Sequence, residues 1–427
     1  MKNYFKIVPL VFVLLFLQTA CVENDTKNSE YSEATKELIN LLNTNPEIKS
    51  MLISSIAKTK QINPDKNTNP AQSLEGYYEF VNWAESAMPW ALLKKSEYPG
   101  IYNNILQSAI YFYFLIDQPL PELTEKGQFR NSLQYYEPFA SWVTTFCQSW
   151  GRYLDSEYSW NAEYYQLALS DEKFGLLKGW YEDPENWNTF NEFFARHLKS
   201  ESMRPVASPE DDSIVASFAD SEPQGLWSID SNSNIVQKEG VVVKSATLKS
   251  IASLIGEDSE YEHEFEGGTF THSFLNVNDY HRYHFPLSGT VKEVRIIPGI
   301  NPVGASIHWD AKNNRYAFDP SLVGWQTIET RGCVILETEE YGLVALLPIG
   351  MAMVGSVNFE ENVKAGGIVK KGDMLGYFKF GGSDFIMVFQ KNVTFTLDAP
   401  KEPGTDYYQH LLMGERLGYL RKKFDVE

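Results

Sequence analysis

The pattern of apolar and polar positions divides the chain into a helical part and a β-rich part. From residue 74 to about 187, apolar residues recur with a helical period in stretches such as YYEFVNWAESAMPWALL and IYNNILQSAIYFYFLIDQPL. From about residue 189 onward, short alternating runs such as GTVKEVRII and GLVALLPI are separated by glycines. The sequence therefore predicts an α+β protein, with an α-helical N-terminal domain at 74–188 and a mainly β domain at 189–427. The stretch NVKAGGIVKKGDMLGYFKFGG is typical of a barrel-sandwich hairpin.

The first residues have the pattern of a processed leader. A short apolar stretch follows Lys2 and Lys6 and ends in Leu-Gln-Thr-Ala-Cys21, which resembles a bacterial lipobox. We expect residues 1–21 to be a lipoprotein signal peptide and Cys21 to carry lipid. The mature protein would then be anchored in the bacterial cell envelope, outside the cytoplasm. The alternative is an ordinary signal peptide with an unmodified cysteine.

Residues 22–73 predict a polar tether followed by short helices. Apolar positions in 31–60 fit two helices that are broken at Asn45-Pro46. Residues 58–73 are polar and contain proline, a composition typical of a linker. The segment is therefore expected to join the lipid anchor to the helical domain.

The charge and the cysteine content argue against several classes of binding protein and against a zinc site. The chain has 427 residues and a net charge of -19, which argues against a nucleic-acid partner and against broad electrostatic binding to anionic lipid. Cys147 and Cys333 are far apart in sequence and are predicted to be buried, inert thiols, although a single bridge stays open. No Cys/His spacing suggests zinc, so no metal site is predicted.

The strongest candidate for chemistry is the Gly381-Gly382-Ser383 sequence inside FKFGGSDFIMVF, where the glycines predict a bend between two strands. Glycine leaves the Gly382 carbonyl unshielded, so the Ser383 hydroxyl can attack it and form an ester. Elimination and hydrolysis of that ester would cut the chain and convert Ser383 into a pyruvoyl group, whose carbonyl condenses with amines and accepts electrons. The alternative is a glycine bend with a solvated serine.

Two histidines fall in one short stretch, Asp279-Tyr-His281-Arg-Tyr-His284-Phe-Pro. On a helix or turn, residues three apart share a face. Three interpretations stay open: a structural histidine that caps a loop, a metal ligand that lacks an evident third partner, or a general acid–base pair.

These motifs together resemble the phosphatidylserine decarboxylase family. DYHRYHFP resembles the family's DYHR-x-H-x-P signature, and FGGS resembles its Gly-Ser self-cleavage site near the C-terminus. FFARHLKSESMRP is similar to the family's FF-x-R-x-L-x-x-x-x-RP segment, and ASFADS stands where the family has P-A-D-G. The resemblance covers residues 189 to 390 in order. The helical region resembles the N-terminal extension of a branch that includes soluble aromatic amino-acid decarboxylases.

The resemblance implies a role for each matching residue. Ser383 would be the self-cleaving nucleophile and pyruvoyl precursor, and Gly382 would supply the attacked carbonyl. His284 matches the histidine that takes the serine proton, and Asp220 matches the carboxylate that orients it. His281 matches the histidine assigned to decarboxylation. No pyridoxal phosphate or metal is implied.

The chain also departs from the family pattern. Asp384 follows the serine where the family usually has threonine or serine, and an extra carboxylate there could perturb a nearby acid or repel a substrate carboxylate. Phe218 and Ser221 replace the proline and glycine of P-A-D-G, and the usual N-E-R segment reads Glu329-Thr330-Arg331. Asp211 is a second candidate for the carboxylate of the triad, ranked below Asp220 because its spacing is too short.

Three functions follow as expectations. The first is a membrane-associated decarboxylase that converts phosphatidylserine to phosphatidylethanolamine and carbon dioxide, with Phe190, Phe193 and Phe194 as a face at the membrane interface or, alternatively, packed between the domains. The second is a decarboxylase of free, aromatic amino acids, and the third is a non-catalytic lipoprotein. The partners implied are a phospholipid or amino-acid substrate, the membrane through the anchor, and the protein's own two chains after cleavage.

Overall fold

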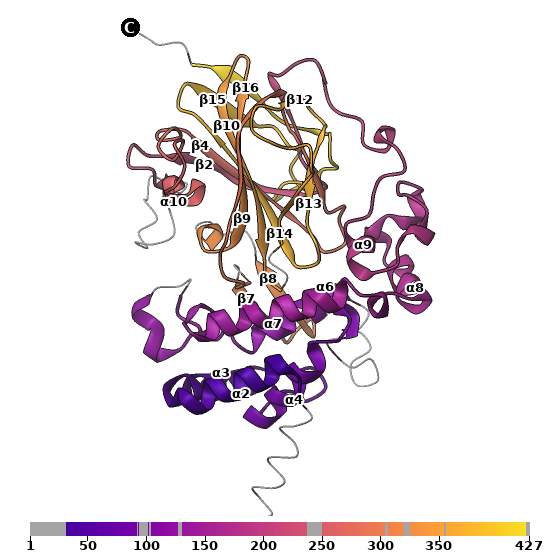
Figure 1. Ribbon diagram of the computed structural model, residues 1–427, viewed down its shortest axis with the longest axis vertical. Coiled ribbons are helices and arrows are strands. Elements are labelled where there is room, and N and C mark those ends of the chain that lie inside the picture. The colour runs from indigo at the N-terminus through magenta and orange to yellow at the C-terminus, as the bar shows by residue number, and fades with distance from the viewer. Residues whose placement is uncertain are drawn as a thin grey trace, which may run out of the picture.

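The computed structural model describes most of the chain from residue 31 onward, and element labels follow Figure 1. The described residues are 31–91, 93, 101, 104–126, 130–236, 250–303, 306–319, 325–353 and 356–423. The predicted signal peptide at 1–21 and its lipidated Cys21 lie outside the described residues, so they stay predictions.

The helical part begins with α2 and α3, which meet at Asn45. Ser32 caps α2 by accepting a hydrogen bond from the Thr35 N–H, and Pro46 starts α3, where a missing N–H costs little. The break predicted at Asn45-Pro46 is thus confirmed. The α-helices are α2 (Glu33–Thr44), α3 (Pro46–Ile62), α4 (Leu74–Ala84), α6 (Ile105–Phe114), α7 (Phe139–Leu154), α8 (Ala162–Ser170), α9 (Phe190–Phe194) and α10 (Ile251–Ile255).

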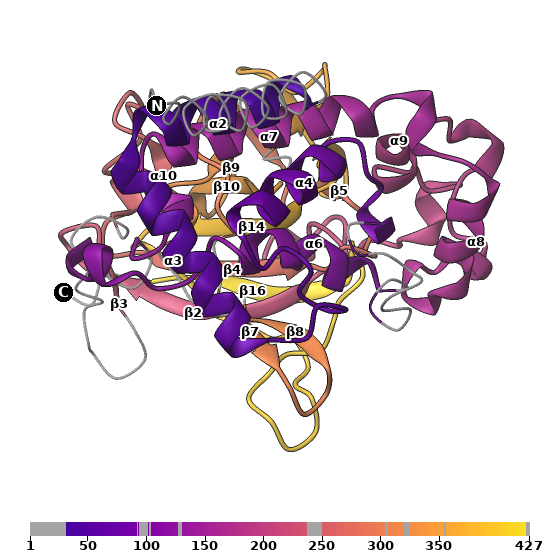
Figure 2. The same cartoon turned by 90° about the horizontal axis from the view of Figure 1, so that it is seen from below.

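The helices form layers against one end of the β region. In Figure 1, α2, α3 and α4 lie farthest from the sheets, α6 and α7 lie between them and the strands, and α8 and α9 lie to one side. Seen from below in Figure 2, these helices spread across the strands behind them. None of the described helices has the length and apolar content needed to cross a bilayer.

The β region is mainly antiparallel. Its largest sheet has eight strands in the order β12-β6-β9-β10-β14-β4-β2-β3, and two three-stranded sheets have the orders β1-β16-β15 and β11-β13-β5. The strands are β1 (Ile214–Ala216), β2 (Glu222–Ile229), β3 (Ile235–Val236), β4 (Thr269–Leu275), β5 (Arg282–His284), β6 (Gly289–Ile297), β7 (Ser306–Asp310), β8 (Arg315–Asp319), β9 (Thr330–Thr338), β10 (Gly342–Met351), β11 (Asn358–Phe359), β12 (Ile368–Val369), β13 (Met374–Tyr377), β14 (Gly382–Phe389), β15 (Val393–Leu397) and β16 (Arg416–Lys422). Helices followed by mostly antiparallel sheets confirm the predicted α+β class.

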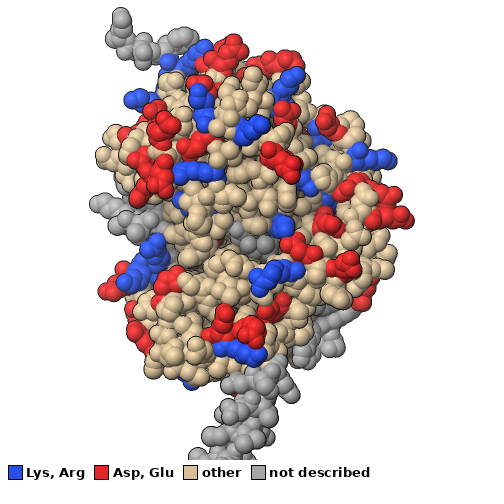
Figure 3. Space-filling model, viewed as in Figure 1, with Lys and Arg blue, Asp and Glu red and all other residues tan. Residues whose placement is uncertain are grey.

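Two hydrophobic cores meet at the large sheet. One core joins the helices to one face of β14 and its neighbours, for example through Phe112, Trp150 and Ile386. The other lies between the sheets and includes Phe385. Because the first core crosses the 188/189 boundary, the helical and β parts pack as one continuous unit. On the face in Figure 3, acidic and basic side chains are interspersed.

The structure corrects two sequence predictions around α9. The spacing of the phenylalanines in NTFNEFFARHLK, residues 188–199, predicts an amphipathic helix over that stretch, but α9 is only five residues long, Phe190–Phe194, with a capping box at its start. Phe190, Phe193 and Phe194 are fully buried. Their burial rules out the interpretation of these three side chains as a membrane-facing surface and confirms that they pack inside the protein.

Two further segments differ from the prediction. Of residues 58–73, predicted as a linker, 58–62 belong to α3, and the rest is fixed to the β region because the Asn63 side chain donates a hydrogen bond to the Tyr316 hydroxyl at 3.2 Å. The predicted hairpin is split, because β12 pairs with β6 whereas β13 pairs with β11 and β5.

Cys147 and Cys333 are buried and unbridged, as expected, and burial raises the pKa of each thiol to about 12.

Candidate active site

Ser383 lies near the start of a central strand. In β14 it is paired with Gly350 of β10 on one side and Leu275 of β4 on the other. The bend predicted for Gly381-Gly382-Ser383 falls at Phe380–Gly381 instead, and Gly382 and Ser383 already belong to β14. Ser383 is fully buried, and its hydroxyl has no hydrogen-bond partner in the described part of the chain. A buried, unpaired hydroxyl is uncommon, which marks this position as a candidate for chemistry.

The alternation of β14 decides which way Ser383 faces. Ser383 and Phe385 share one face of the strand, and the Phe385 ring stacks on Phe218 at 3.9 Å between ring centres. The Phe218 carbonyl in turn accepts a hydrogen bond from the His284 N–H at 2.7 Å. Ser383 therefore faces the side of the sheet on which His284 lies.

His284 is held by both ring nitrogens. Its Nδ1 lies 2.8 Å from the Gly372 carbonyl oxygen, and its Nε2 lies 3.2 Å from the Tyr280 hydroxyl. A carbonyl only accepts, so Nδ1 carries the proton and Nε2 is the basic nitrogen. Burial lowers the pKa of His284 to about 4. The imidazole is therefore neutral near pH 7, the form a general base requires.

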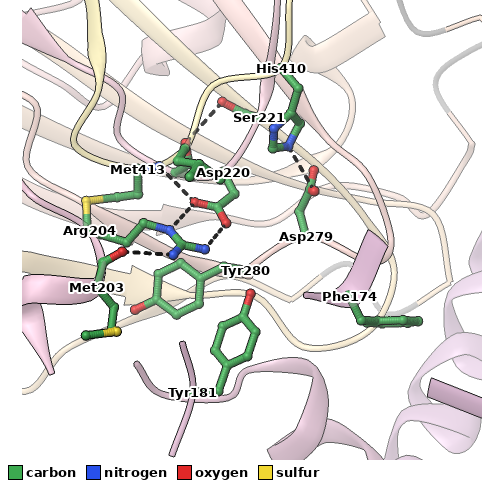
Figure 4. Close-up of polar contacts among 12 residues, drawn as sticks. Phe174, Tyr181, Met203, Arg204, Asp220, Ser221, Asp279, Tyr280, His410 and Met413 are labelled. Atoms are coloured by element: carbon green, nitrogen blue, oxygen red, sulfur yellow. Dashed lines mark hydrogen bonds and ion pairs between the residues drawn. The ribbon is translucent and has the colours of Figure 1, made fainter. Parts of the chain in front are cut away.

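Asp220 is bound to an arginine. Its two carboxylate oxygens accept hydrogen bonds from Arg204 at 2.6 and 2.9 Å, and one oxygen also accepts the Met413 N–H at 2.8 Å. Figure 4 shows this pair with Tyr280 beside it. Asp220 therefore lies near enough to His284 for its charge to act on the imidazole, but its hydrogen bonds go to Arg204 and Met413. Asp211 is exposed, and its carboxylate accepts hydrogen bonds from the Ser213 N–H and hydroxyl.

His281 has a drier environment. It is fully buried, and its ring stacks on Phe194 with 3.8 Å between ring centres. Its Nδ1 lies 2.9 Å from the Asp279 carbonyl oxygen, which leaves Nε2 unprotonated and without a hydrogen-bond partner among the described residues. Burial, helped by the positive charge of Arg196, lowers the pKa of His281 well below its usual range.

The carboxylate of Asp384, which departs from the family pattern, is paired with buried side chains. Asp384 points to the opposite face of β14 from Ser383, as the alternation of a strand requires. Its carboxylate lies 3.0 Å from His272 Nδ1 and also accepts a hydrogen bond from Gln326 at 3.3 Å. The extra carboxylate is therefore paired and directed away from the serine hydroxyl.

The segment that replaces N-E-R lies level with the candidate cleavage site. Thr330 pairs with Gly350, which pairs with Ser383 on the next strand. Glu329 is fully buried, neither of its carboxylate oxygens has a hydrogen-bond partner among the described residues, and burial raises its pKa well above the usual range. Arg331 donates hydrogen bonds to the carbonyls of Ser253 and Leu254.

Cavities approach the site from several sides. One of about 410 Å³ reaches His284 and Tyr280, and another of about 300 Å³ reaches Asp220. A smaller apolar cavity of about 30 Å³ touches Gly381 and is lined by Ile110 and Tyr113 of α6. Within the described ranges, no group of three or more His, Cys, Asp or Glu side chains is arranged to hold a metal ion.

Sequence reasoning missed two residues that organise the site. Tyr280 contacts His284 directly, and Arg204 binds Asp220. Both lie inside the quoted motifs, Tyr280 in DYHRYHFP and Arg204 in the final Arg-Pro of FFARHLKSESMRP. Their presence in those motifs could have marked both as candidate site residues, but the sequence does not show which atoms they contact.

Comparison with known proteins adds a family match. A family model described as phosphatidylserine decarboxylase matches residues 190–419. The phosphatidylserine decarboxylase proenzyme of Fusobacterium nucleatum subsp. nucleatum is 32% identical over 248 residues, which are 56% of this chain and 72% of that protein. The family-model match at 190–419 covers all the candidate residues from Asp220 to Ser383.

Other relatives differ in length and in the substrate that they are named for. Phosphatidylserine decarboxylase proenzyme 2 of Oryza sativa subsp. japonica is 34% identical over 252 residues, 58% of this chain and 36% of the rice protein. This chain thus spans only about a third of the rice protein's length. L-tryptophan decarboxylase of Psilocybe cubensis is 30% identical over 228 residues, 51% of this chain and 50% of that protein.

Proposed function

Because this chain belongs to the phosphatidylserine decarboxylase family, a family of carboxy-lyases, we propose that it cuts itself between Gly382 and Ser383 and acts as a pyruvoyl-dependent decarboxylase. The observation that carries the proposal is the Ser383 hydroxyl, which is buried, directly follows two glycines and has no partner among the described residues. A hydroxyl that is satisfied by neither protein nor bulk water is free to attack the adjacent carbonyl.

The proposed cleavage uses the chain's own atoms and one water. The Ser383 Oγ attacks the Gly382 carbonyl carbon, the C–N bond breaks, and the Oγ proton passes to the released amine. Elimination then moves the Cα proton of residue 383 to a base and breaks its Cβ–Oγ bond, which leaves a carboxylate on Gly382 and a dehydroalanine at 383. The dehydroalanine regains a proton at Cβ as it becomes an imine. Hydrolysis releases ammonia and leaves a pyruvoyl group at position 383. That group supplies a carbonyl that binds the substrate amine and accepts the electrons released with carbon dioxide.

His284 fits the role of base in the first step. It is neutral near pH 7, its basic Nε2 is defined by the contact of Nδ1 with Gly372, and it lies on the Ser383 side of the sheet. To reach the serine, Nε2 would exchange its contact with Tyr280 for one with Ser383. Asp220 would act on His284 through its charge, since its hydrogen bonds go to Arg204 and Met413. His281 is proposed to serve the decarboxylation step.

Phosphatidylserine is the first proposed substrate, with phosphatidylethanolamine and carbon dioxide as products. The family description and the names of the Fusobacterium and rice relatives support it. A lipid on Cys21 would hold the enzyme at a membrane of the bacterial envelope, outside the cytoplasm, and would bring it close to a lipid substrate.

A free aromatic amino acid is the second proposed substrate. The apolar cavity beside Gly381 is walled by α6, so the helical region closes over this end of β14 with apolar side chains. At about 30 Å³ this cavity is far too small for an aromatic side chain, so it does not select the substrate. The similarity to an L-tryptophan decarboxylase is what supports a free aromatic amino acid.

The experiment that tests the proposal follows carbon dioxide released from carboxyl-labelled substrates. Purified protein is given phosphatidylserine in mixed vesicles or, separately, tryptophan and tyrosine. Release from either class that is absent in Ser383→Ala supports the reaction and identifies the substrate. Release that persists in Ser383→Ala, or no release from any of these substrates, would contradict it.

A further inference from the structure

The helical region holds the two residues that precede the glycines of the proposed cleavage site. The Phe380 N–H donates a hydrogen bond to the Asn191 side-chain oxygen at 3.0 Å. The Lys379 ammonium lies 2.8 Å from the carboxylate of Asp155, the C-cap residue of α7. The Asn191 amide in turn donates to Asp155 at 3.0 Å. We call these four residues the clamp.

The Phe380 side chain is fixed by the same region. It is 1% exposed, and its ring lies 5.4 Å from Trp150, 5.2 Å from Phe190 and 5.2 Å from Phe194 between ring centres. All three contacts are edge-on, a favourable arrangement for aromatic pairs. Both the main chain and the side chain of Phe380 are therefore anchored on α7 and α9.

The position of the clamp matters because of the glycines that follow it. Phe380 lies in the bend between β13 and β14, where its N–H has no partner strand, and the nearly buried Asn191 supplies the acceptor. On the other side of Gly381, strand pairing resumes at Gly382, which is opposite Met351. Gly381-Gly382, the most permissive stretch of backbone in the site, is thus fixed at both ends.

We propose that Asn191 and Asp155 are positioning residues through which the helical region aligns the Gly382 carbonyl for attack by Ser383. The inference rests on the proposed self-cleavage. In that step a bond forms between Ser383 Oγ and the Gly382 carbonyl carbon while the Gly382–Ser383 C–N bond breaks. Attack requires the two reacting atoms to be held about 3–3.5 Å apart in the correct orientation. Strand pairing restrains Ser383, and the clamp restrains the chain segment that leads into Gly381 and Gly382.

The test measures how fast newly made full-length chain is cut. The chain is produced by pulsed cell-free synthesis, and the fraction converted to two chains is followed with time by mass spectrometry. Asn191→Ala leaves the buried Phe380 N–H without an acceptor and is expected to slow cutting about tenfold. Asp155→Asn removes the charge that pairs with the partly exposed Lys379 and weakens the hydrogen bond from the Asn191 amide, and it is expected to slow cutting about threefold.

Two matched variants sharpen the result. Asn186→Ala removes an exposed asparagine of the same region whose side chain donates a hydrogen bond to Glu182, and it should cut at the wild-type rate. Exchanging the two clamp partners, Asn191→Asp with Asp155→Asn, restores a donor opposite an acceptor and should recover most of the rate lost in Asn191→Asp alone.

Two further measurements separate positioning from loss of folding. Each clamp substitution is also made in Ser383→Ala, which cannot be cut, and Asp155→Asn should leave the melting temperature of that background unchanged. Hydroxylamine, which cleaves esters, is added to cutting reactions. Because the clamp acts on formation of the ester, hydroxylamine should not restore the rate of Asn191→Ala.

The outcomes are distinct. Slow cutting in both clamp variants, with a normal Asn186→Ala, supports the inference. Wild-type rates in Asn191→Ala and Asp155→Asn would overturn it and leave the proposed function standing, as would a rate restored by hydroxylamine, which would move the defect to a later step. A wild-type chain that is never cut would overturn the proposed function and, with it, this inference.

Discussion

His281 and His284 are three residues apart, yet they occupy different environments. His284 has both ring nitrogens in contact with protein groups and borders a cavity of about 410 Å³. His281 is stacked on Phe194, and its Nε2 has no partner within the described chain. The difference shows that spacing alone does not assign a role to a histidine, because the role depends on which atoms surround each ring nitrogen.

The two environments suit the two histidines to different steps of the proposed reaction. A neutral imidazole on the Ser383 side of the sheet fits the self-cleavage step. A sealed imidazole with an unpaired nitrogen fits a proton transfer that needs water excluded. Each of the following experiments tests whether the two histidines serve separate steps.

The largest effect is expected from His284→Gln. Glutamine keeps polar atoms in the space of the ring but cannot take a proton, so cutting at Gly382-Ser383 should slow about a thousandfold. The time course of chain cleavage after cell-free synthesis measures this. A cutting rate within about threefold of wild type would remove His284 from the role of base.

A smaller and different effect is expected from His281→Asn. The chain should still be cut, since among the described residues neither His281 Nε2 nor the Ser383 hydroxyl has a hydrogen-bond partner, and the His281 ring is stacked on Phe194. Carbon dioxide release by the cut protein should fall about a hundredfold. The comparison fails if His281→Asn blocks cutting as strongly as His284→Gln does.

Both histidines should make the fold sensitive to acid. Burial lowers the pKa of His284 from the ordinary 6.5 to about 4, so the unfolded chain binds this proton more readily than the folded one. Stability is therefore complete above about pH 6.5 and is lost as pH falls, by about 2 kcal/mol between pH 7 and pH 5 for this residue alone. Urea unfolding of Ser383→Ala at the two pH values measures the loss.

The control for that experiment is the same measurement on Ser383→Ala combined with His284→Gln. The difference in unfolding free energy between pH 7 and pH 5 should be smaller in the double variant, because one titrating group has been removed. An identical loss in both proteins would mean that His284 does not titrate as its burial implies.

The smallest effect is expected from Tyr280→Phe. The Tyr280 hydroxyl donates to His284 Nε2 and so favours the neutral imidazole. Without it, the pKa of His284 should rise by less than about one unit, and cutting should begin to fail at a correspondingly higher pH. Tyr181→Phe, a change in the tyrosine stacked beside Tyr280, serves as the control and should leave the pH profile unchanged. An unshifted profile in Tyr280→Phe would show that this contact does not tune His284.

Much of the fold was accessible from sequence because it depends on local patterns. The break at Asn45-Pro46 follows from proline's preference for the first turn of a helix, and the change from helical to alternating periodicity near residue 189 separates the two parts. The sequence left open whether the phenylalanines of α9 face a core or a membrane, because their spacing fits a helical period equally well in both cases. Only tertiary packing against Trp90 and Phe380 decides between these.

The candidate site was predictable in its residues but not in its contacts. The resemblance selected Ser383, His284 and Asp220, but it did not indicate that Tyr280 bonds His284 or that Arg204 takes both oxygens of Asp220. Hydrogen bonds between residues far apart in sequence depend on loop geometry, which no periodic pattern encodes. The contacts of the clamp, including that of Asn191 with Phe380, could not be predicted from the sequence for the same reason.

The most direct test of the central claim is the intact mass of the purified protein under denaturing conditions. Self-cleavage predicts two chains, one that ends at Gly382 and one of residues 383–427 with a pyruvoyl group at its start, and Ser383→Ala should abolish the split. A single uncut chain from a folded wild-type sample would contradict the account.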